Sequence, residues 1–172
     1  MRAEADSIMD LLLNLALYAG LRRSELYYLR WQDIDLKLKL IHIRAHGKFV
    51  PKNKKPGTVP INNKLFKILK KAYPKGKISD DKKYIFGEFH KSEWANPTIP
   101  LSKKFTLLSK KAGVKNAGLH VCRHTFASHL VQAGEPLLVV KELMRHSDIK
   151  STMVYAHLAP DQPRKAVESL GY

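Results

Sequence analysis

Apolar residues recur three and four positions apart near the start of the chain, which is the spacing of one helix face. They are Ile8, Leu11, Leu12, Leu15 and Tyr18. The pattern predicts a helix over residues 6–19 that ends at Gly20, because glycine readily adopts the left-handed backbone of a helix terminus. A second, short helix is expected over 24–31, with Ser24 as its N-terminal cap.

Apolar and polar residues then alternate over 38–45, and this period of two predicts a β-strand. The segment 31–36 that precedes the strand is expected to be a turn. The next stretch, 46–57, is polar, rich in lysine and interrupted by proline and glycine, so it is expected to form a loop or an irregular hairpin. Shorter strands are expected over 58–61 and 84–86. Together the strands predict a small three-stranded antiparallel sheet.

Helical spacing returns after the second strand and predicts several amphipathic helices. Their ranges are 62–71, capped by Asn62; 101–113; 120–134, closed by Gly134; 136–146, opened by Pro136; and about 161–170. Ser147 and Ser151 are both candidate caps for the segment that holds Tyr155. Because no internal repeat or low-complexity linker interrupts the pattern, the chain is predicted to be one mainly helical domain of the α+β class, residues 1–172.

The charge of the chain adds information about its partner. The 172 residues include 31 Lys and Arg against 15 Asp and Glu, which gives a formal net charge of +16. Such an excess favours a polyanion, because side chains that neutralise phosphates release condensed counterions. A nucleic acid, such as double-stranded DNA, is one such partner, and an anionic membrane is the rival. A basic protein without specific DNA chemistry, such as a ribosome-associated protein, is an equally good interpretation of the charge alone.

Cysteine and hydropathy exclude several classes of protein. The single cysteine, Cys122, cannot form an intramolecular disulfide, and the sequence lacks the Cys/His spacing of a zinc site. No segment is long and apolar enough to cross a bilayer, and the first residues lack the layout of a signal peptide. We therefore expect a cytoplasmic protein without a bound metal or a membrane contact.

Three segments combine the arginine, histidine and tyrosine side chains that phosphate chemistry uses. They are AGLRRSELYYLRW at 19–31, HVCRHTFASHL at 120–130 and RHSDIKSTMVYAH at 145–157. Their order, internal spacing and key residues resemble the three motifs of the tyrosine recombinase (phage integrase) family, from about residue 8 to the C-terminus. The resemblance implies the family's helical catalytic domain with a small sheet, and site-specific DNA recombination in integration or excision.

The resemblance makes Arg22 and Arg123 the clamp on the scissile phosphate. Negative charge grows on the non-bridging oxygens of a phosphodiester under attack, and a guanidinium offers two parallel hydrogen bonds at constant charge. Loss of one such donor typically costs about 3–4 kcal/mol of barrier. Glu25, acidic within a basic motif, is implied to position neighbouring groups rather than to act as a catalytic acid.

Tyr155 is implied to be the nucleophile, which leaves a 3′-phosphotyrosyl bond and a free 5′-hydroxyl. That bond retains the energy for religation, so no ATP, metal or other cofactor is expected. A phenol has a pKa of about 10, so it needs a nearby base or a positive field to lose its proton and attack. His120, three residues from Arg123 on one helical face, is implied as the base, and His146 as a hydrogen-bond partner of the phosphate. His124 is expected to point elsewhere and to be structural.

A lysine on the hairpin between the second and third strands protonates the 5′-oxygen in this family. The stretch KNKKPGTVP at 52–60 fits the family's pattern when Pro60 is aligned, which selects Lys52. Lys48 and Lys54 are the alternatives. Basic side chains without a catalytic role are expected to contact the DNA backbone. That set is Lys48, Lys54, Lys55 and Arg145.

Three positions depart from the family's pattern. Arg145 stands where the family usually has glycine, and it could add a phosphate contact or change the turn, since arginine tolerates a positive φ poorly. Gly57 stands where the family usually has arginine. Cys122 replaces a usual leucine and is apolar enough to fill a core. None of the three changes removes an implied catalytic group.

Relatives usually carry an N-terminal DNA-binding domain and act as tetramers on two DNA sites. The sequence begins at the first helix of the catalytic domain, so we expect this chain alone to be monomeric, to bind DNA weakly and to recombine it poorly. A type IB topoisomerase, which only relaxes DNA, and a non-catalytic DNA-binding module of the same fold are the main alternatives. A basic helical RNA-binding protein is a third.

Overall fold

The computed structural model describes residues 2–76, 83–91, 98–160 and 167–171. Its helices are α1 (Arg2–Ala19), α2 (Arg23–Tyr27), α3 (Asn63–Ala72), α4 (Ile99–Lys111), α5 (Leu119–Gln132), α6 (Leu137–Met144) and α7 (Lys150–Met153). Short 3-10 helices are η1 (Trp31–Asp33), η3 (Gly87–Lys91) and η4 (Ala156–Leu158). The strands are β1 (Ile34–Asp35), β2 (Leu40–Ile43) and β3 (Gly57–Pro60). This arrangement confirms the expected mainly helical fold with a small sheet.

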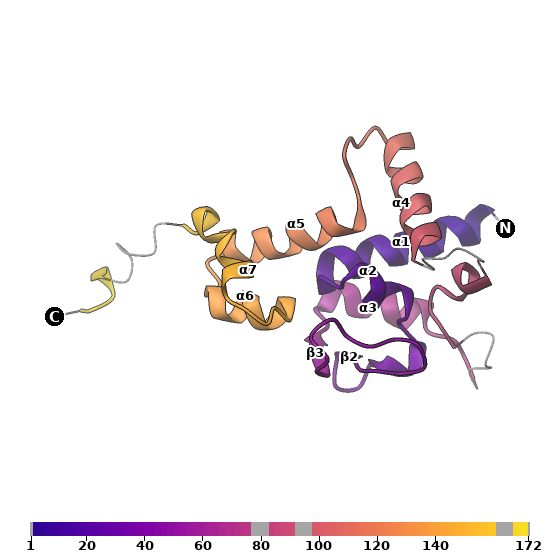
Figure 1. The fold of residues 1–172 in the computed structure, drawn as a ribbon, viewed down its shortest axis with the longest axis horizontal. Helices are drawn as coiled ribbons and strands as arrows, with labels where there is room; N and C mark the ends of the chain where they lie inside the picture. Colours follow the sequence, from indigo (N-terminus) through magenta and orange to yellow (C-terminus); the bar gives the residue numbers. More distant parts are fainter. Residues whose placement is uncertain (1, 77–82, 92–97, 161–166, 172) are drawn as a thin grey trace.

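Helix α5 connects two hydrophobic cores. The larger core joins α1 to α4 and the sheet, and it takes Leu119 and Cys122 from the first turn of α5. The smaller core lies around α6 and α7, and it takes Ala127 and Val131 from the second half of α5. In Figure 1, α5 extends from α1 toward α6 and α7, so a single helix spans both halves. Side chains on its polar face therefore lie where the two halves meet.

The sheet has three antiparallel strands in the described part of the chain, in the order β1-β2-β3. Ile41 of β2 lies opposite Ile34 and Val59, and all three side chains are buried. The expected third strand at 84–86 was wrong. Ile85 donates its N–H to the Leu29 carbonyl, so this segment pairs with the chain after α2 instead of with the sheet. Strand β1, which we expected to be a turn, has two residues and is too short for a periodic signal.

Two helix caps differ from the expectation, and one agrees. The Asn62 side chain accepts a hydrogen bond from the Leu65 N–H at 2.8 Å and caps α3 as predicted. Helix α2 begins one residue before Ser24, and the Glu25 carboxylate accepts the backbone N–H of Arg22 at 2.7 Å. A carboxylate three residues into a helix can satisfy an orphan N–H in this way. The expected cap by Ser24 was therefore wrong.

Helix α7 begins without a serine cap. Instead, the Asp148 side chain accepts the N–H of Lys150 at 3.0 Å, so neither Ser147 nor Ser151 holds the predicted position. Residues 161–166 of the expected last helix lie outside the described residues. No helix within the described ranges is long and apolar enough to cross a membrane.

Candidate active site at the junction of the two cores

A tight turn after α1 places the first arginine of the site. Gly20 has a φ of +55°, and a Cβ at this position would overlap the ring of Phe126 on α5. A residue without a Cβ is needed for both reasons. The turn leads directly into Arg22, whose terminal nitrogens donate to Glu25 Oε1 and to the Arg145 carbonyl, both at 2.8 Å. Because a guanidinium carries five N–H groups, donors remain for a ligand.

Glu25 holds this arginine from a buried position. Only 2% of the residue is exposed, and its two oxygens bind the Arg22 side chain and, at 2.7 Å, the Arg145 side chain. Burial raises the pKa of Glu25, but Arg145 and Arg22 outweigh that cost, so the pKa lies below its ordinary value. Glu25 is therefore a charged anchor for two cations, in agreement with the positioning role implied by the sequence.

Helix α5 supplies the second arginine. The Arg123 guanidinium donates to the carbonyls of Gly20 at the end of α1 and Met144 at the end of α6, so it ties the two halves together. Burial, together with repulsion by Arg22 and Arg145, lowers the pKa of Arg123 to about 9. Three cations placed this closely repel one another, so a bound anion would stabilise the site.

His146 follows α6 and faces the arginines. Its Nδ1 shares a hydrogen bond of 2.9 Å with the hydroxyl of Thr152, a side chain that is fully buried. Burial and the charges of Arg123, Arg22 and Arg145 lower the pKa of His146 to about 4. The imidazole is therefore neutral near pH 7, and Thr152 fixes the direction of its ring.

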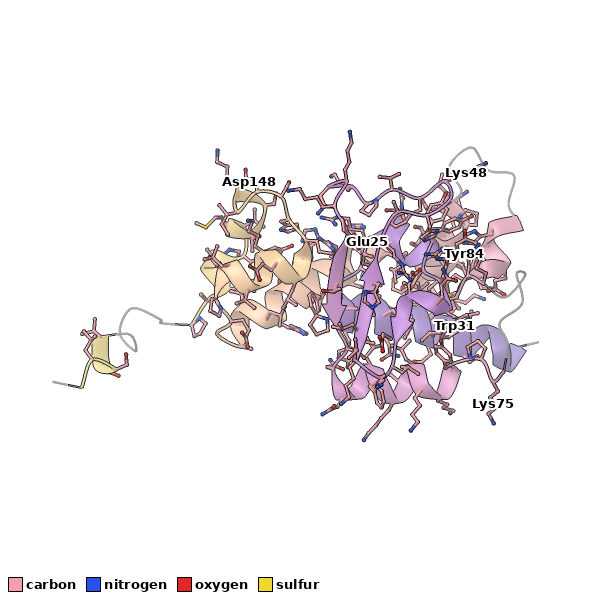
Figure 2. All side chains as sticks on the ribbon, turned by 90° about the horizontal axis from the view of Figure 1, so that it is seen from below. Glu25, Trp31, Lys48, Lys75, Tyr84 and Asp148 are labelled. Carbon is pink, nitrogen blue, oxygen red and sulfur yellow. The ribbon has the colours of Figure 1, made fainter. Side chains whose placement is uncertain are left out.

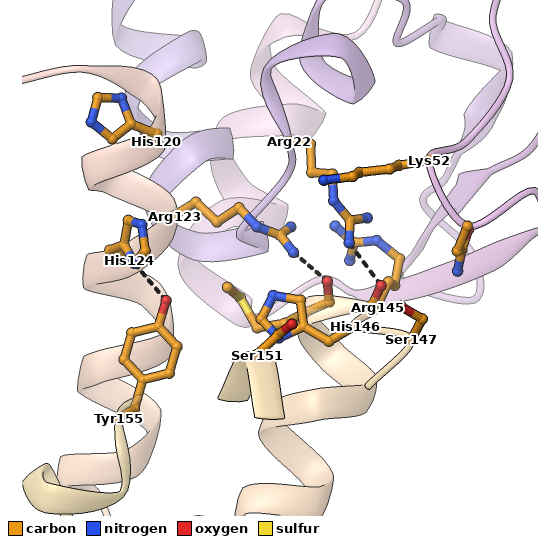
Figure 3. A pocket seen from close by; sticks show the side chains of 12 residues that line it. Arg22, Lys52, His120, Arg123, His124, Arg145, His146, Ser147, Ser151 and Tyr155 are labelled. Atoms are coloured by element: carbon orange, nitrogen blue, oxygen red, sulfur yellow. Dashed lines mark hydrogen bonds between the residues drawn. The ribbon is translucent and has the colours of Figure 1, made fainter. Parts of the chain in front are cut away.

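Tyr155 reaches the site from the end of α7. Only 5% of the residue is exposed, and its hydroxyl shares a hydrogen bond of 2.6 Å with Nδ1 of His124 (Figure 3). Burial raises the pKa of the Tyr155 hydroxyl, and Arg123 offsets part of that increase. The expectation that His124 points away from the site was wrong. Residues 120 and 124 are four apart and share a helix face, which was the available signal.

The β2–β3 hairpin adds a lysine from the opposite side. Figure 3 shows the Lys52 side chain extended toward Arg22. Lys52 and Asn53 line the same cavity as the arginines, whereas Lys55 lines a neighbouring hollow with Gly57. Lys48 and Lys54 do not line this cavity. The geometry thus favours Lys52 among the hairpin lysines as the one that faces the site.

These side chains surround one cavity of about 410 Å³ between the hairpin, α5 and the α6–α7 turn. The cavity is lined by Arg22, Lys52, Asn53, His120, Arg123, His124, Met144, Arg145, His146, Ser147, Ser151 and Tyr155. The structure therefore brings together all six residues for which the family resemblance implies catalytic roles. It adds His124, which the sequence interpretation had left out.

Comparison with known proteins places the chain in a family. The sequence profile of the phage integrase family matches residues 2–162. The chain belongs to this family. A tyrosine recombinase of Pseudothermotoga lettingae is 33% identical over 162 residues, which cover 93% of the chain and 53% of that relative. The chain thus spans about half the length of the relatives it matches.

Solved structures of two integrases have the same fold. The integrase of transposon Tn1549, in complex with transposon right end DNA, matches 100% of this chain and 65% of its own chain with a TM-score of 0.71 at 22% identity. The catalytic domain of bacteriophage HP1 integrase matches 98% of this chain and 92% of its own, with a TM-score of 0.64 at 26% identity. The second match covers nearly all of both chains.

Arg145 is the departure from the family pattern that the structure explains most directly. The turn after α6 keeps a left-handed backbone at Arg145, with a φ of 53° and a ψ of 43°. The side chain is directed inward, and only 8% of the residue is exposed. Its expected contact with DNA stays a prediction, which this burial disfavours. Within the described residues, no group of three or more His, Cys, Asp or Glu side chains is placed to hold a metal ion.

Proposed function

We propose that the cavity is the active site of a site-specific DNA recombinase that cleaves and rejoins strands through a 3′-phosphotyrosyl intermediate. The observation that carries the proposal is the position of the Tyr155 hydroxyl in one cavity with Arg22, Arg123 and His146. A buried nucleophile beside a cluster of cations suits attack on a phosphodiester, which is itself an anion. The family membership supports the same reaction.

The first step forms a bond between the Tyr155 oxygen and phosphorus and breaks the bond from phosphorus to the 5′-oxygen. Arg22 and Arg123 donate hydrogen bonds to the non-bridging oxygens, where charge develops. His146, neutral at pH 7, donates a further hydrogen bond to the phosphate from its second ring nitrogen. Lys52 gives a proton to the departing 5′-oxygen. Religation reverses each of these transfers, so the cycle requires neither ATP nor a metal ion.

The proton of Tyr155 needs an acceptor, and two histidines of α5 qualify. The sequence interpretation favoured His120 for the role. The hydrogen bond of 2.6 Å between the Tyr155 hydroxyl and His124 Nδ1 favours His124 instead. His120 lines the same cavity, four residues before His124. We therefore assign the first proton transfer to His124 and leave His120 to contact the phosphate.

The DNA-bound assembly extends beyond this chain. The relatives are about twice as long. For the longer protein we propose a tetramer on two DNA sites. For this chain alone we propose a monomer that contacts DNA phosphates with Lys48, Lys54 and Lys55. Phosphate contacts carry no sequence information, and a target sequence is recognised by side chains that contact base edges. The duplexes used to detect cleavage therefore contain random bases instead of one chosen sequence.

The test is the formation of a covalent adduct. The chain is incubated with a pool of nicked suicide duplexes in which the bases around the nick are randomised, without metal and with a chelator. Protein–DNA adducts are separated under denaturing conditions, and their DNA is sequenced. We expect an enriched sequence from the wild type and no adduct from Tyr155→Phe. Because this chain alone is expected to bind DNA weakly, the protein is present at a concentration that saturates the duplexes. An adduct that persists in Tyr155→Phe, or none from the wild type under these conditions, contradicts the proposal.

A second assay separates recombination from DNA relaxation. A supercoiled plasmid that lacks the enriched sequence is incubated with the chain. Retained supercoiling is expected of a recombinase, whereas progressive relaxation would favour the topoisomerase alternative.

A further inference from the structure

Arg145 occupies a backbone conformation that arginine does not favour. It lies in the left-handed region at the end of α6, which costs a residue with a Cβ about 1–2 kcal/mol relative to the right-handed region. Glycine avoids this cost. An arginine that is retained at such a position, with its side chain buried, must make contacts that offset the strain.

The contacts of Arg145 are directed at the carboxylate that also holds Arg22. Its guanidinium donates to Glu25 Oε2 and to the Leu143 carbonyl, both at 2.7 Å, and it approaches the Gly20 carbonyl at 3.4 Å. Its own carbonyl accepts a hydrogen bond from Arg22 at 2.8 Å. Backbone and side chain of one residue thus contact both members of the Arg22–Glu25 pair.

Gly57 at the start of β3 leaves the space in which the Arg145 side chain lies. A Cβ at Gly57 would be 3.1 Å from Cδ and 3.6 Å from Cγ of Arg145.

The charges explain what this arrangement achieves. Arg22 and Glu25 alone form a neutral pair, in which the carboxylate competes with a phosphate for the guanidinium. Arg145 adds a second cation to the same carboxylate, so the group of three carries a net positive charge. We propose that Arg145 is a positioning residue, seated against Gly57, that neutralises Glu25 and thereby leaves Arg22 available to the phosphate. The inference rests on the proposed phosphate chemistry of the site.

The first test measures the binding of inorganic phosphate, which needs no DNA and no cleavage. Arg145→Met keeps most of the side-chain bulk but removes the charge, and Arg145→Lys keeps the charge. We expect Arg145→Met to bind phosphate about tenfold more weakly and Arg145→Lys to recover most of the affinity. Unfolding in urea confirms that each variant is folded at the pH of the titration. Wild-type affinity in Arg145→Met overturns the proposal.

Repeating the substitution on a Glu25→Gln background shows whether Arg145 acts through Glu25. If its role is to neutralise the carboxylate, Arg145→Met costs clearly less affinity once the carboxylate is gone. Equal losses in both backgrounds would mean that Arg145 acts independently of Glu25, and the positioning role would be wrong. A purely structural residue would give the same loss in both.

A separate test addresses the packing of Arg145 against Gly57. Gly57→Val should weaken phosphate binding by displacing Arg145, and it should have no such effect in an Arg145→Gly background, where the space is free. A similar loss of phosphate affinity in both backgrounds would contradict the packing of Arg145 against Gly57. Adduct formation is measured in parallel. A wild type that binds phosphate but forms no adduct would refute the recombinase proposal while leaving the role of Arg145 measurable.

Discussion

The protonation of His146 is set by its neighbours rather than by its own chemistry. Burial and three arginines lower its pKa to about 4, so the neutral imidazole is the form present at neutral pH. A phosphate bound between Arg22 and Arg123 would screen the repulsion that disfavours the imidazolium. The protonation of this histidine is therefore expected to respond to the ligand.

A pH-dependent stability follows from this shift. The unfolded chain takes up a proton on His146 near pH 6.5, whereas the folded chain does so only near pH 4. Stability is therefore expected to fall as the pH drops from about 6.5 to about 4 and to level off below. Urea unfolding between pH 4 and 7 should show a steeper decline for the wild type than for His146→Gln. The control, His129→Gln on an exposed part of α5, should keep the wild-type slope.

The contact between Tyr155 and His124 predicts which histidine accepts the proton. Removal of a general base typically lowers a rate by a factor of about 10²–10⁴. We expect His124→Gln to reduce the single-turnover rate of adduct formation by this amount, and His120→Gln to reduce it less. A rate that collapses in His120→Gln but not in His124→Gln would return the role to His120.

At the scale of elements, the turn between α1 and α2 is the point at which packing and catalysis meet. Gly20 ends α1, lies against Phe126 of α5, and offers its carbonyl to Arg123. A substitution here moves both the helix end and the arginine clamp. The same positive φ occurs at Gly47 on the hairpin, where a Cβ would meet no other atom within 4 Å.

The two glycines form a matched pair for measurement. Gly47→Ala should cost only the left-handed strain, about 1–2 kcal/mol of unfolding free energy. Gly20→Ala should cost that amount and about 1–3 kcal/mol more, because the methyl group displaces Phe126. Urea denaturation gives both values. Equal costs would show that the ring of Phe126 moves freely and that the turn tolerates a side chain.

At the scale of the whole molecule, the positive charge is spread over more than one face, but only one face holds the cavity. Figure 2 places Lys48 and Asp148 on one edge of the molecule and Lys75 on the opposite edge. Asp148 directly follows Ser147, which lines the cavity. The net charge of +16 attracts DNA from a distance, whereas contacts at the cavity edge set its docked position.

The salt dependence of DNA binding distinguishes the two faces. Each phosphate contact contributes a slope of about 0.9 to the decline of log affinity with log salt. We expect Lys48→Ala to reduce the slope by about that amount and Lys75→Ala to leave it nearly unchanged. Fluorescence anisotropy of a labelled duplex at several salt concentrations measures both. A change in Lys75→Ala as large as that in Lys48→Ala would mean that DNA binds without a preferred face.

The sequence determined the family, the helical fold and six of the residues that line the cavity. Motif spacing carries this information, because a helix face repeats every three to four residues and an ordered set of motifs is rarely met by chance. The same local signals located the Asn62 cap and the hairpin. They could not locate β1, because a strand of two residues is too short to show an alternating pattern.

Only the tertiary structure decided the contacts between distant segments. Tyr155 lies 31 positions from the histidine it contacts, and Arg145 lies 120 positions from Glu25. Which of two neighbouring histidines meets the tyrosine depends on how α7 packs against α5. The inward direction of Arg145 depends on Gly57, a residue of another element. Packing and the pairing of buried charges decide these contacts, and neither leaves a repeating pattern in the sequence.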